Sequence, residues 1–574
     1  MLRIPFIALG VALVMGCGKP APRTHGGGDI HGGVFNINET QVLRSIFPLQ
    51  IALVSEQHVG GQIYEGLVRF NARDLSVEPA LAERWEIDPS NKIYTFHLRH
   101  DVRFHDDTAF PDGIGRGLTA KDVVHCFTSI CEKGLGDAVF WMFQDKVEGA
   151  DEYHASGRKG GEVKGIKALD DHTVQITLVR PQPNFLQIIA GSGCWIWPRE
   201  LLQAHDQELL HHAIGTGPFR LKVVRPEEAI VLERNADYWG QDGQGRPLPY
   251  LDAVRITLTT DKDKEVAEFL RGHLTMVSEV SLPSFGLLAD SLDPATGERR
   301  FLVRSTPALA VQYYGFNANK PPFNDARVRR AFAMALDKHR LVDSVLHGLA
   351  VPAEHGLVAP GLTGYPYGLV PGLPYDPDSA RILLALAGYP QGRGFPRVQL
   401  HVNTSGFGYS SVAAAAQEML WRELGVAITV TTIAPKTYYD RIERGHALFW
   451  REGWVADLPD PENFLALLYG KNAEADTALP SPLNTTRYAN PRFDALFLSA
   501  SSKGNEVERM KDLALAEAVA MHDVPLVPLY HERYVMLVAP HVHGLHINAM
   551  ELLDLREVHL GRQAPVPAAA DTTS

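Results

Sequence analysis

The feature that most constrains the fold is a repeated switch between two hydrophobic periodicities along the chain. Residues 94–99 and 173–178 alternate apolar and polar side chains, which is typical of half-buried strands. Helical spacing of apolar residues occurs at 120–131, 325–346, 379–388 and 411–424. Because strands and helices alternate rather than segregate, the sequence predicts an α/β fold.

Length and composition narrow the class of protein further. The chain has 574 residues, well beyond the ~250–300 residues at which one hydrophobic core stops growing, so several domains or lobes are expected. Hydrophobic residues make up 45% and charged residues 21%, which excludes a polytopic membrane protein and a disordered chain. The net charge of −12 shows no basic surplus, so we expect no nucleic-acid partner.

The N-terminus has the pattern of an export signal. Arg3 precedes an apolar run over 4–15, and the small residue Gly16 follows that run directly before Cys17. The run is too short to cross a bilayer as a mature helix, which needs about 20 residues. The pattern therefore predicts a signal peptide over 1–16.

Residues 14–17 resemble a bacterial lipobox, in which a peptidase cuts before the cysteine and the new N-terminal Cys17 receives lipid. Residues 17–30 are rich in Pro and Gly, which is typical of a flexible tether. We therefore expect a lipid-anchored protein at the periplasmic or extracytoplasmic face of the cell membrane. An ordinary signal peptide followed by an incidental cysteine is the alternative.

Separated segments spread from about residue 60 to 535 carry a family resemblance in their order and spacing. They are 64–68 (YEGLV), 79–85 (PALAERW), 94–99 (YTFHLR), 102–106 (VRFHD), 118–124 (LTAKDVV), 215–219 (GTGPF), 232–240 (LERNADYWG), 250–252 (YLD), 316–317 (FN), 322–331 (PFNDARVRRA), 453–457 (GWVAD), 460–461 (DP) and 525–530 (PLVPLY). Together they resemble the extracytoplasmic solute-binding proteins of the peptide, dipeptide and nickel class (family 5), which deliver ligands to ABC importers. The loop at 107–117 is longer than the usual family pattern.

The resemblance implies a type II periplasmic-binding-protein-like fold of three lobes, with a ligand cleft between two hinged lobes. Lobe I would be discontinuous and lobes II and III continuous, with the chain crossings near 301–316 and 523–530 as the hinge. The implied ranges are 31–62, 189–300 and 524–560 for lobe I, 63–188 for lobe II, 301–523 for lobe III and 561–574 for a disordered tail.

The resemblance also implies the partners. The protein would bind a peptide or another small solute, act as a monomer, and dock on the permease subunits of an ABC importer. We expect no enzymatic activity, because the sequence contains no G-x-S-x-G elbow, no H-E-x-x-H pair and no lysine-bearing phosphate loop. No cofactor and no metal is expected.

The segment 449–457 is the candidate ligand strand, because in the resembled peptide binders it runs along the ligand. Asp457 matches the carboxylate that pairs with the ligand's α-ammonium in those proteins. An ammonium enclosed in a cleft needs such a counter-charge, because an unpaired buried charge is strongly destabilising. The alternative is that Asp457 caps a loop before Pro459.

Three neighbours of Asp457 complete the candidate site. Arg451 matches a position that can contact a peptide's terminal carboxylate through a charge-assisted bond, or else it forms a strand-edge ion pair with Glu452. Gly453 would let another backbone approach closely. Trp454 would form a wall of the cleft, or else belong to a lobe core.

Other ligands on the same fold remain open, namely a nickel chelate, a siderophore, an opine or an oligosaccharide. A receptor or chaperone that feeds no importer is also compatible with the sequence. His541, His543 and His546 form a cluster in the sequence, but a period-two strand pattern favours a structural role over a metal site. Cys126, Cys131 and Cys194 fit no compact metal-ligand pattern.

Overall fold

The computed structural model describes residues 30–40, 43–205, 208–225, 228–278, 300–403, 408–474, 476 and 479–561. The predicted signal peptide, the lipidation residue Cys17 and nearly all of the predicted tether and C-terminal tail lie outside the described residues. Within the described ranges, no helix combines the length and the apolar character that crossing a membrane requires.

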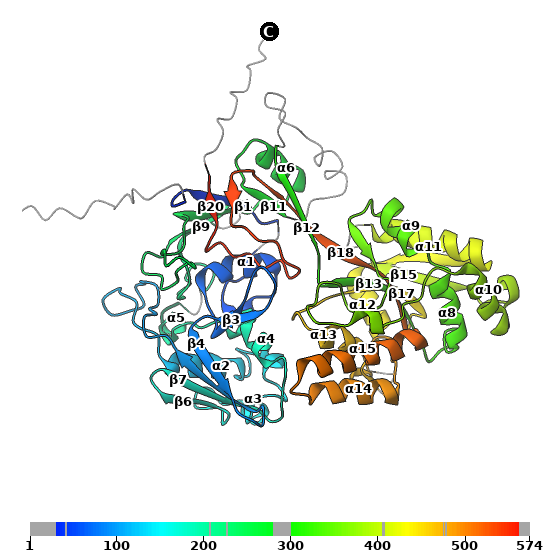
Figure 1. The fold of residues 1–574 in the computed structure, drawn as a ribbon, viewed down its shortest axis with the longest axis horizontal. Coiled ribbons are helices and arrows are strands. Elements are labelled where there is room, and N and C mark those ends of the chain that lie inside the picture. The colour runs from blue at the N-terminus through cyan, green and yellow to red at the C-terminus, as the bar shows by residue number, and fades with distance from the viewer. Residues whose placement is uncertain are drawn as a thin grey trace, which may run out of the picture.

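The first body of the molecule consists of the described residues of 30–278 and 539–561, and it contains two four-stranded sheets (Figure 1). The first sheet has the order β1 (Val34–Asn38), β10 (Ala253–Thr257), β9 (Ala229–Arg234) and β8 (Phe219–Arg225). The second has the order β4 (Ala82–Ile87), β5 (Ile93–Leu98), β7 (Thr173–Thr177) and β6 (Ile166–Asp170). Two short ribbons pair β2 (Val68–Phe70) with β3 (Val77–Pro79) and β19 (Val542–His543) with β20 (His559–Leu560).

The helices of the first body lie between these strands in the chain. They are α1 (Val54–Ile63), α2 (Ala120–Ile130), α3 (Ala150–Ser156), α4 (Phe185–Ala190), α5 (Arg199–His205) and α6 (Lys262–Leu270). The start of α2 follows from local chemistry, because the Asp122 carboxylate accepts hydrogen bonds from the Thr119 backbone N–H and hydroxyl. Both predicted strands and this predicted helix are present within a residue of their expected bounds.

The second body, residues 309–525, packs around an eight-stranded sheet, three strands of which come from outside this range, at 276–278, 302–307 and 526–538. The main path has the order β11 (Met276–Ser278), β18 (Leu526–Val538), β13 (Ala310–Phe316), β17 (Phe449–Val455), β15 (Val398–Asn403) and β16 (Ile428–Ile433). Two further strands, β12 (Leu302–Pro307) and β14 (Ala350–Pro352), pair with β18. Its helices are α8 (Ala326–Met334), α9 (Lys338–Arg340), α10 (Pro377–Leu386), α11 (Tyr409–Leu424), α12 (Pro435–Glu443), α13 (Pro461–Leu465), α14 (Pro491–Ser501) and α15 (Glu506–Asp523).

Side chains of β13 alternate between two hydrophobic cores on the two faces of this sheet. Tyr314 and Phe316 belong to a core that α8, α10 and α11 cover, whereas Tyr313 belongs to a core covered by α13, α14 and α15. Period-two alternation along a fully buried strand explains how one segment serves both cores. The predicted α/β class is therefore confirmed.

One predicted helix is wrong. In place of a continuous helix over 325–346, α8 ends at Met334 and α9 begins after Asp337. The Asp337 carboxylate accepts a hydrogen bond from the Arg340 backbone N–H, so it caps a new helix start. The capping aspartate thus divides an apolar pattern that looked continuous.

Two antiparallel strands join the two bodies. β12 pairs with β18 from Leu302↔Val538 to Pro307↔Arg533, and β13 continues the pairing farther along β18. Figure 1 shows β12 and β18 passing between the bodies. The predicted hinge segment 301–316 contains β12, whereas 523–530 overlaps only the start of β18, whose pairing with β12 lies at 533–538. The hinge role and the division into three lobes stay predictions.

The bodies also touch away from the hinge. Leu75 of the first body packs in the core that contains α14 and α15. At a second place, a Cβ atom on Gly504 would lie 2.8 Å from Asn91 Nδ2. Burial lowers the pKa of Lys146 of the first body, and the charge of Glu462 in the second body opposes this shift. In the described conformation the two bodies therefore meet at α13–α15 as well as along β12 and β18.

Candidate ligand-binding site

The candidate ligand strand β17 is paired fully along one side and only at its start along the other. It pairs antiparallel with β13 from Phe316↔Phe449 to Ala310↔Val455. On the other side, β15 pairs only with Phe449 and Trp450. Within the strands that the structure describes, the second half of β17 therefore has one open edge. Such an edge can accept an extended peptide as an added strand.

Gly453 is required by a neighbouring side chain rather than by a neighbouring backbone. Gln312 lies opposite Gly453 in the β13–β17 register. A Cβ atom at position 453 would lie 2.5 Å from Gln312 Oε1, which is closer than real contacts allow. The Gln312 side chain therefore lies where another backbone was predicted, and a ligand role for Gly453 stays a prediction.

Arg451 lies buried on the same sheet face as Gln312. Its guanidinium donates hydrogen bonds to Asn403 Oδ1 at 3.1 Å and to Gln312 Oε1, and it stacks over the Tyr409 ring at 3.3 Å. Its Nε has no hydrogen-bond partner among the described residues. A buried guanidinium held by neutral groups, with a donor to spare, is suited to an anion such as a carboxylate.

The alternative reading of Arg451, an ion pair with Glu452, does not match the structure. Successive side chains of a strand point to opposite faces. Glu452 accepts hydrogen bonds from Trp450 Nε1 at 2.9 Å and from the Thr485 hydroxyl at 2.8 Å. Burial raises the pKa of Glu452, and these hydrogen bonds oppose the rise.

Asn463 of α13 ties Trp454 to Asp457. Its Oδ1 accepts hydrogen bonds from the Trp454 indole N–H at 2.8 Å and from the Asp457 backbone N–H at 3.2 Å, and its Nδ2 donates to Asp457 Oδ2 at 3.4 Å. The Trp454 indole is half-buried and packs against the core beneath α14 and α15. The two readings of Trp454 are therefore compatible, because one side of the ring faces the core and part of it stays accessible.

Asp457 is a carboxylate without a cationic partner in the part of the chain that the structure describes. Asn463 is the side chain that hydrogen-bonds to it, and no described Lys, Arg or His forms an ion pair with it. Water reaches the side chain, yet burial raises the pKa of Asp457 above its usual range. Solvent exposure and a pKa raised by burial can both hold for Asp457 if water reaches its carboxylate from one side while protein atoms cover the other. The cap of α13 is Asp460, whose side chain accepts from the Glu462 N–H at 2.8 Å. Asp457 therefore does not cap that helix, and the choice between its ligand role and a loop-capping role stays a prediction.

Sequence reasoning missed the residues that position the site. Gln312, Asn403 and Tyr409 surround Arg451, but they come from β13, β15 and α11, far away in the chain. Nothing in their local sequence marks them, because only the sheet register places them next to Arg451. Asn463 carried a weak signal, since it lies six residues after Asp457 in the first turn of a helix.

A separate pocket lies in the first body. Its lining includes Tyr64, Glu65, Arg69, Trp195 and Arg556, and it contains none of the four predicted ligand residues. The Glu65 carboxylate in this pocket accepts hydrogen bonds from the Tyr238 hydroxyl at 2.8 Å and from the Trp239 indole at 3.0 Å. These bonds hold Glu65 in a polar network with neighbouring scaffold residues.

The C-terminal histidines do not gather into a metal site among the described residues. His543 lies on β19 beside His559 of β20, and His546 accepts a hydrogen bond from Arg73 at 3.2 Å. The one described group of His, Cys, Asp or Glu side chains close enough to share an ion is Asp107, His205 and His212. The three described cysteines are buried and unpaired with one another.

Comparison with known proteins supports the family resemblance seen in the sequence. The family model of the bacterial extracellular solute-binding proteins, family 5 middle region, matches residues 76–476. Among curated proteins, the chain is 29% identical to heme-binding protein A of Haemophilus influenzae over 489 residues, covering 84% of each protein. It is 27% identical to the dipeptide-binding protein of Escherichia coli K12 over 497 residues, covering 85% of the chain and 87% of the relative.

A solved structure shares the fold over nearly the whole chain. The periplasmic binding protein DppA of Helicobacter pylori, associated with an ABC transporter and crystallised with the peptide STSA, superposes with a TM-score of 0.72 at 25% identity. The match covers 93% of this chain and 99% of that protein. The arrangement of two bodies joined by β12 and β18 is therefore that of a periplasmic binding protein.

Proposed function

The chain belongs to the bacterial extracellular solute-binding proteins of family 5, and from this premise we propose that it captures peptides with a free N-terminus and delivers them to an ABC importer. Its predicted family and its periplasmic-binding-protein-like fold are confirmed. The chain is thus a transport binding protein rather than an enzyme.

The observation that carries the peptide proposal is the unpaired carboxylate of Asp457. A peptide ammonium would supply the cation that the described protein does not, and the open edge of β17 would bond the peptide backbone. Hydrogen bonds to the peptide main chain do not depend on the ligand's side chains, so peptides of varied sequence would bind. Arg451 lies six residues before Asp457 and would attract the carboxylate end of a short peptide.

A peptide bound at Asp457 would also favour closure of the cleft between the two bodies. A ligand stabilises the closed state only if it binds that state more tightly than the open one. Asp457 lies on the second body, so a peptide that also touches the first body would favour contacts such as Asn91 with Gly504. The permease subunits of the importer would then recognise the closed form.

Calorimetry with matched peptides tests the ammonium role. We expect wild-type protein to bind a tripeptide with a free N-terminus well over tenfold more tightly than its N-acetylated form. Asp457→Ala should remove most of that difference, and Asp378→Ala, which removes an exposed carboxylate on α10, should preserve it. Equal affinity of the wild type for both peptides would overturn the role proposed for Asp457.

A second candidate ligand class is non-peptide, and one relative gives it weight. Heme-binding protein A is among the similar curated proteins, so a porphyrin joins the nickel chelates, siderophores, opines and oligosaccharides as alternatives. Native mass spectrometry of the protein as purified separates these ligands by mass, because solutes enclosed between two lobes often survive purification. A Soret absorption band after heme titration, with no peptide adduct, would favour the heme alternative.

We also propose that Cys17 carries lipid and anchors the protein outside the cytoplasmic membrane. The support is the lipobox-like segment 14–17. Labelled palmitate should enter the wild type and not Cys17→Ser. Retention of the label by the serine variant would remove the lipoprotein proposal without touching the peptide proposal.

A further inference from the structure

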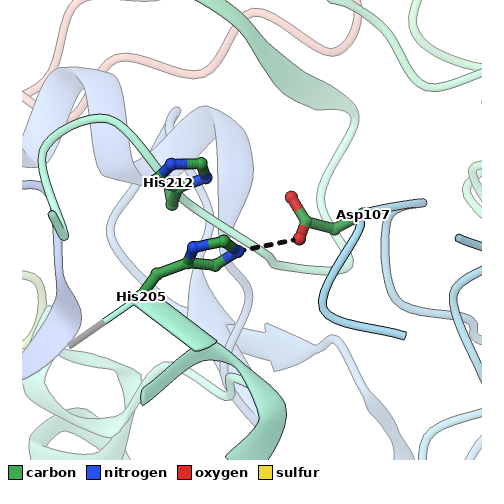
Figure 2. Close-up of side chains that lie close together, drawn as sticks. All are labelled: Asp107, His205 and His212. Atoms are coloured by element: carbon green, nitrogen blue, oxygen red, sulfur yellow. Dashed lines mark hydrogen bonds and ion pairs between the residues drawn. The ribbon is translucent and has the colours of Figure 1, made fainter. Parts of the chain in front are cut away.

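The loop over 107–117, which is longer than the family pattern, meets two histidines from a distant segment. Asp107 Oδ1 lies 3.1 Å from His205 Nε2, although the two residues are 98 positions apart in the chain. The rings of His205 and His212 stack with centroids 3.7 Å apart and an angle of 2° between their planes (Figure 2). One carboxylate and two imidazoles therefore share a small volume on the first body.

The loop holds Asp107 in place before any ion is considered. Asp107 Oδ1 accepts a hydrogen bond from the Ala109 N–H at 2.8 Å, and the Asp107 carbonyl accepts from the Phe110 N–H at 3.1 Å. The Asp106 carboxylate accepts from the Gly115 N–H at 2.9 Å and closes the far end of the loop. The carboxylate thus points toward α5 from a preorganised turn.

The spacing of the three side chains suits one small cation. One donor atom from each of Asp107, His205 and His212 lies within 4.8 Å of the others. Around a tetrahedral zinc ion, with bonds of about 2.1 Å, neighbouring donors are roughly 3.4 Å apart. Because the two rings are stacked and nearly parallel, one imidazole would have to turn out of the stack for both ring nitrogens to point at the same ion. All three are partly buried, with side-chain exposures of 21%, 14% and 31% respectively.

The charge balance favours a cation over a simple ion pair. Two stacked imidazoles repel each other when both are protonated, so separate ion pairs with Asp107 and Glu208 would place two positive rings face to face. Glu208 Oε2 lies 3.5 Å from His212 Nε2 and adds a second acidic group beside the cluster. Two neutral imidazoles with one or two carboxylates form a donor set that zinc and similar divalent ions prefer.

We propose that Asp107, His205 and His212 bind one divalent transition-metal ion, with Glu208 or water completing its coordination. The ion would connect the loop at 107–117 to the end of α5, and so link predicted lobe II to predicted lobe I. This site is separate from Asp457, and its test does not depend on which solute the protein carries.

The test uses the full chain after chelator treatment, titrated with Zn²⁺ by calorimetry and with Co²⁺ by visible absorption. We expect one tight equivalent and, with Co²⁺, absorption bands typical of low coordination number. His212→Ala and Asp107→Asn should each weaken binding at least tenfold. His211→Ala, at the adjacent exposed histidine, should bind as the wild type does.

Thermal unfolding with and without metal separates binding from folding. The unfolding midpoint of the chelated His212→Ala and Asp107→Asn proteins should match that of the chelated wild type, and Zn²⁺ should raise the midpoint of the wild type alone. Equal zinc affinity of wild type and His212→Ala would overturn the site, because the remaining histidines would then be the binders. Absence of a stoichiometric equivalent in the wild type would overturn it as well.

Discussion

Two carboxylates three residues apart, Asp457 and Asp460, have opposite surroundings. Asp460 is fully buried, caps α13, and forms an ion pair at 2.6 Å with Arg509, which is itself 1% exposed. Asp457 is reached by water, lacks a cationic partner among the described residues, and has a raised pKa. Asp460 therefore has its cationic partner within the protein, whereas Asp457 has none among the described residues and is free to pair with a ligand.

The difference teaches how to separate scaffold from site in this segment. A buried charge with its partner in place contributes to a unique fold, and removing either partner is costly. A partly desolvated charge without a partner is a small stability cost that a ligand can offset. Sequence alone treats the two aspartates alike, because both precede prolines or helix starts within a short stretch.

The largest expected effect is on the stability of Asp460→Ala. The change removes the cap of α13 and leaves the Arg509 guanidinium buried with weaker partners, Glu462 and Glu506, each at 3.3 Å. We expect the free energy of unfolding to fall by about 3 kcal/mol, measured by chemical denaturation. Asp457→Ala is the matched control, and a comparable loss from it would erase the contrast between the two aspartates.

The next effect is a pH dependence of peptide affinity. Burial raises the pKa of Asp457, so its carboxylate takes up a proton at a higher pH than an ordinary aspartate does. The affinity for a peptide ammonium should be highest at pH values above the pKa of Asp457, where the carboxylate is ionised. Below that pKa the affinity should fall by up to about tenfold for each pH unit. Calorimetry from pH 7 to pH 4 checks this, with the peptide's own carboxylate replaced by an amide.

Asp457→Asn is the control for that titration. Its affinity should be lower at pH 7 and nearly flat over the same range. A wild-type profile as flat as that of the asparagine variant would show that the carboxylate does not pair with the ligand.

The smallest expected effect belongs to Gly453→Ala. The added methyl would meet the Gln312 amide, which is held between Arg451 and Glu532. We expect a loss of about 1 kcal/mol in the free energy of unfolding, as for mild overpacking. If the Gln312 side chain is the obstacle, the double variant Gly453→Ala with Gln312→Ala should lose less unfolding free energy than the sum of the two single variants. A loss equal to or greater than that sum would show that Gln312 is not the obstacle.

Much of the fold could be predicted because its signals are local. The strand patterns at 94–99 and 173–178 and the cap at Thr119 depend on side chains within a few residues of one another. The failure at 325–346 has a local cause too, because Asp337 begins a new helix inside an apolar pattern. In the candidate site, Asp457 and Trp454 lie in one short segment, so a segment resemblance could mark them.

The sequence by itself determined the α/β class, the family resemblance and the candidate strand at 449–457, because these depend on neighbours along the chain. Only the tertiary structure decided what surrounds them. It buried Arg451 among three distant residues, left Asp457 unpaired near an Asp460 that is ion-paired with Arg509, and brought Asp107 to His205 across 98 positions. Electrostatic and packing partners act through space, and no local pattern records which distant residues the fold brings within a few ångströms.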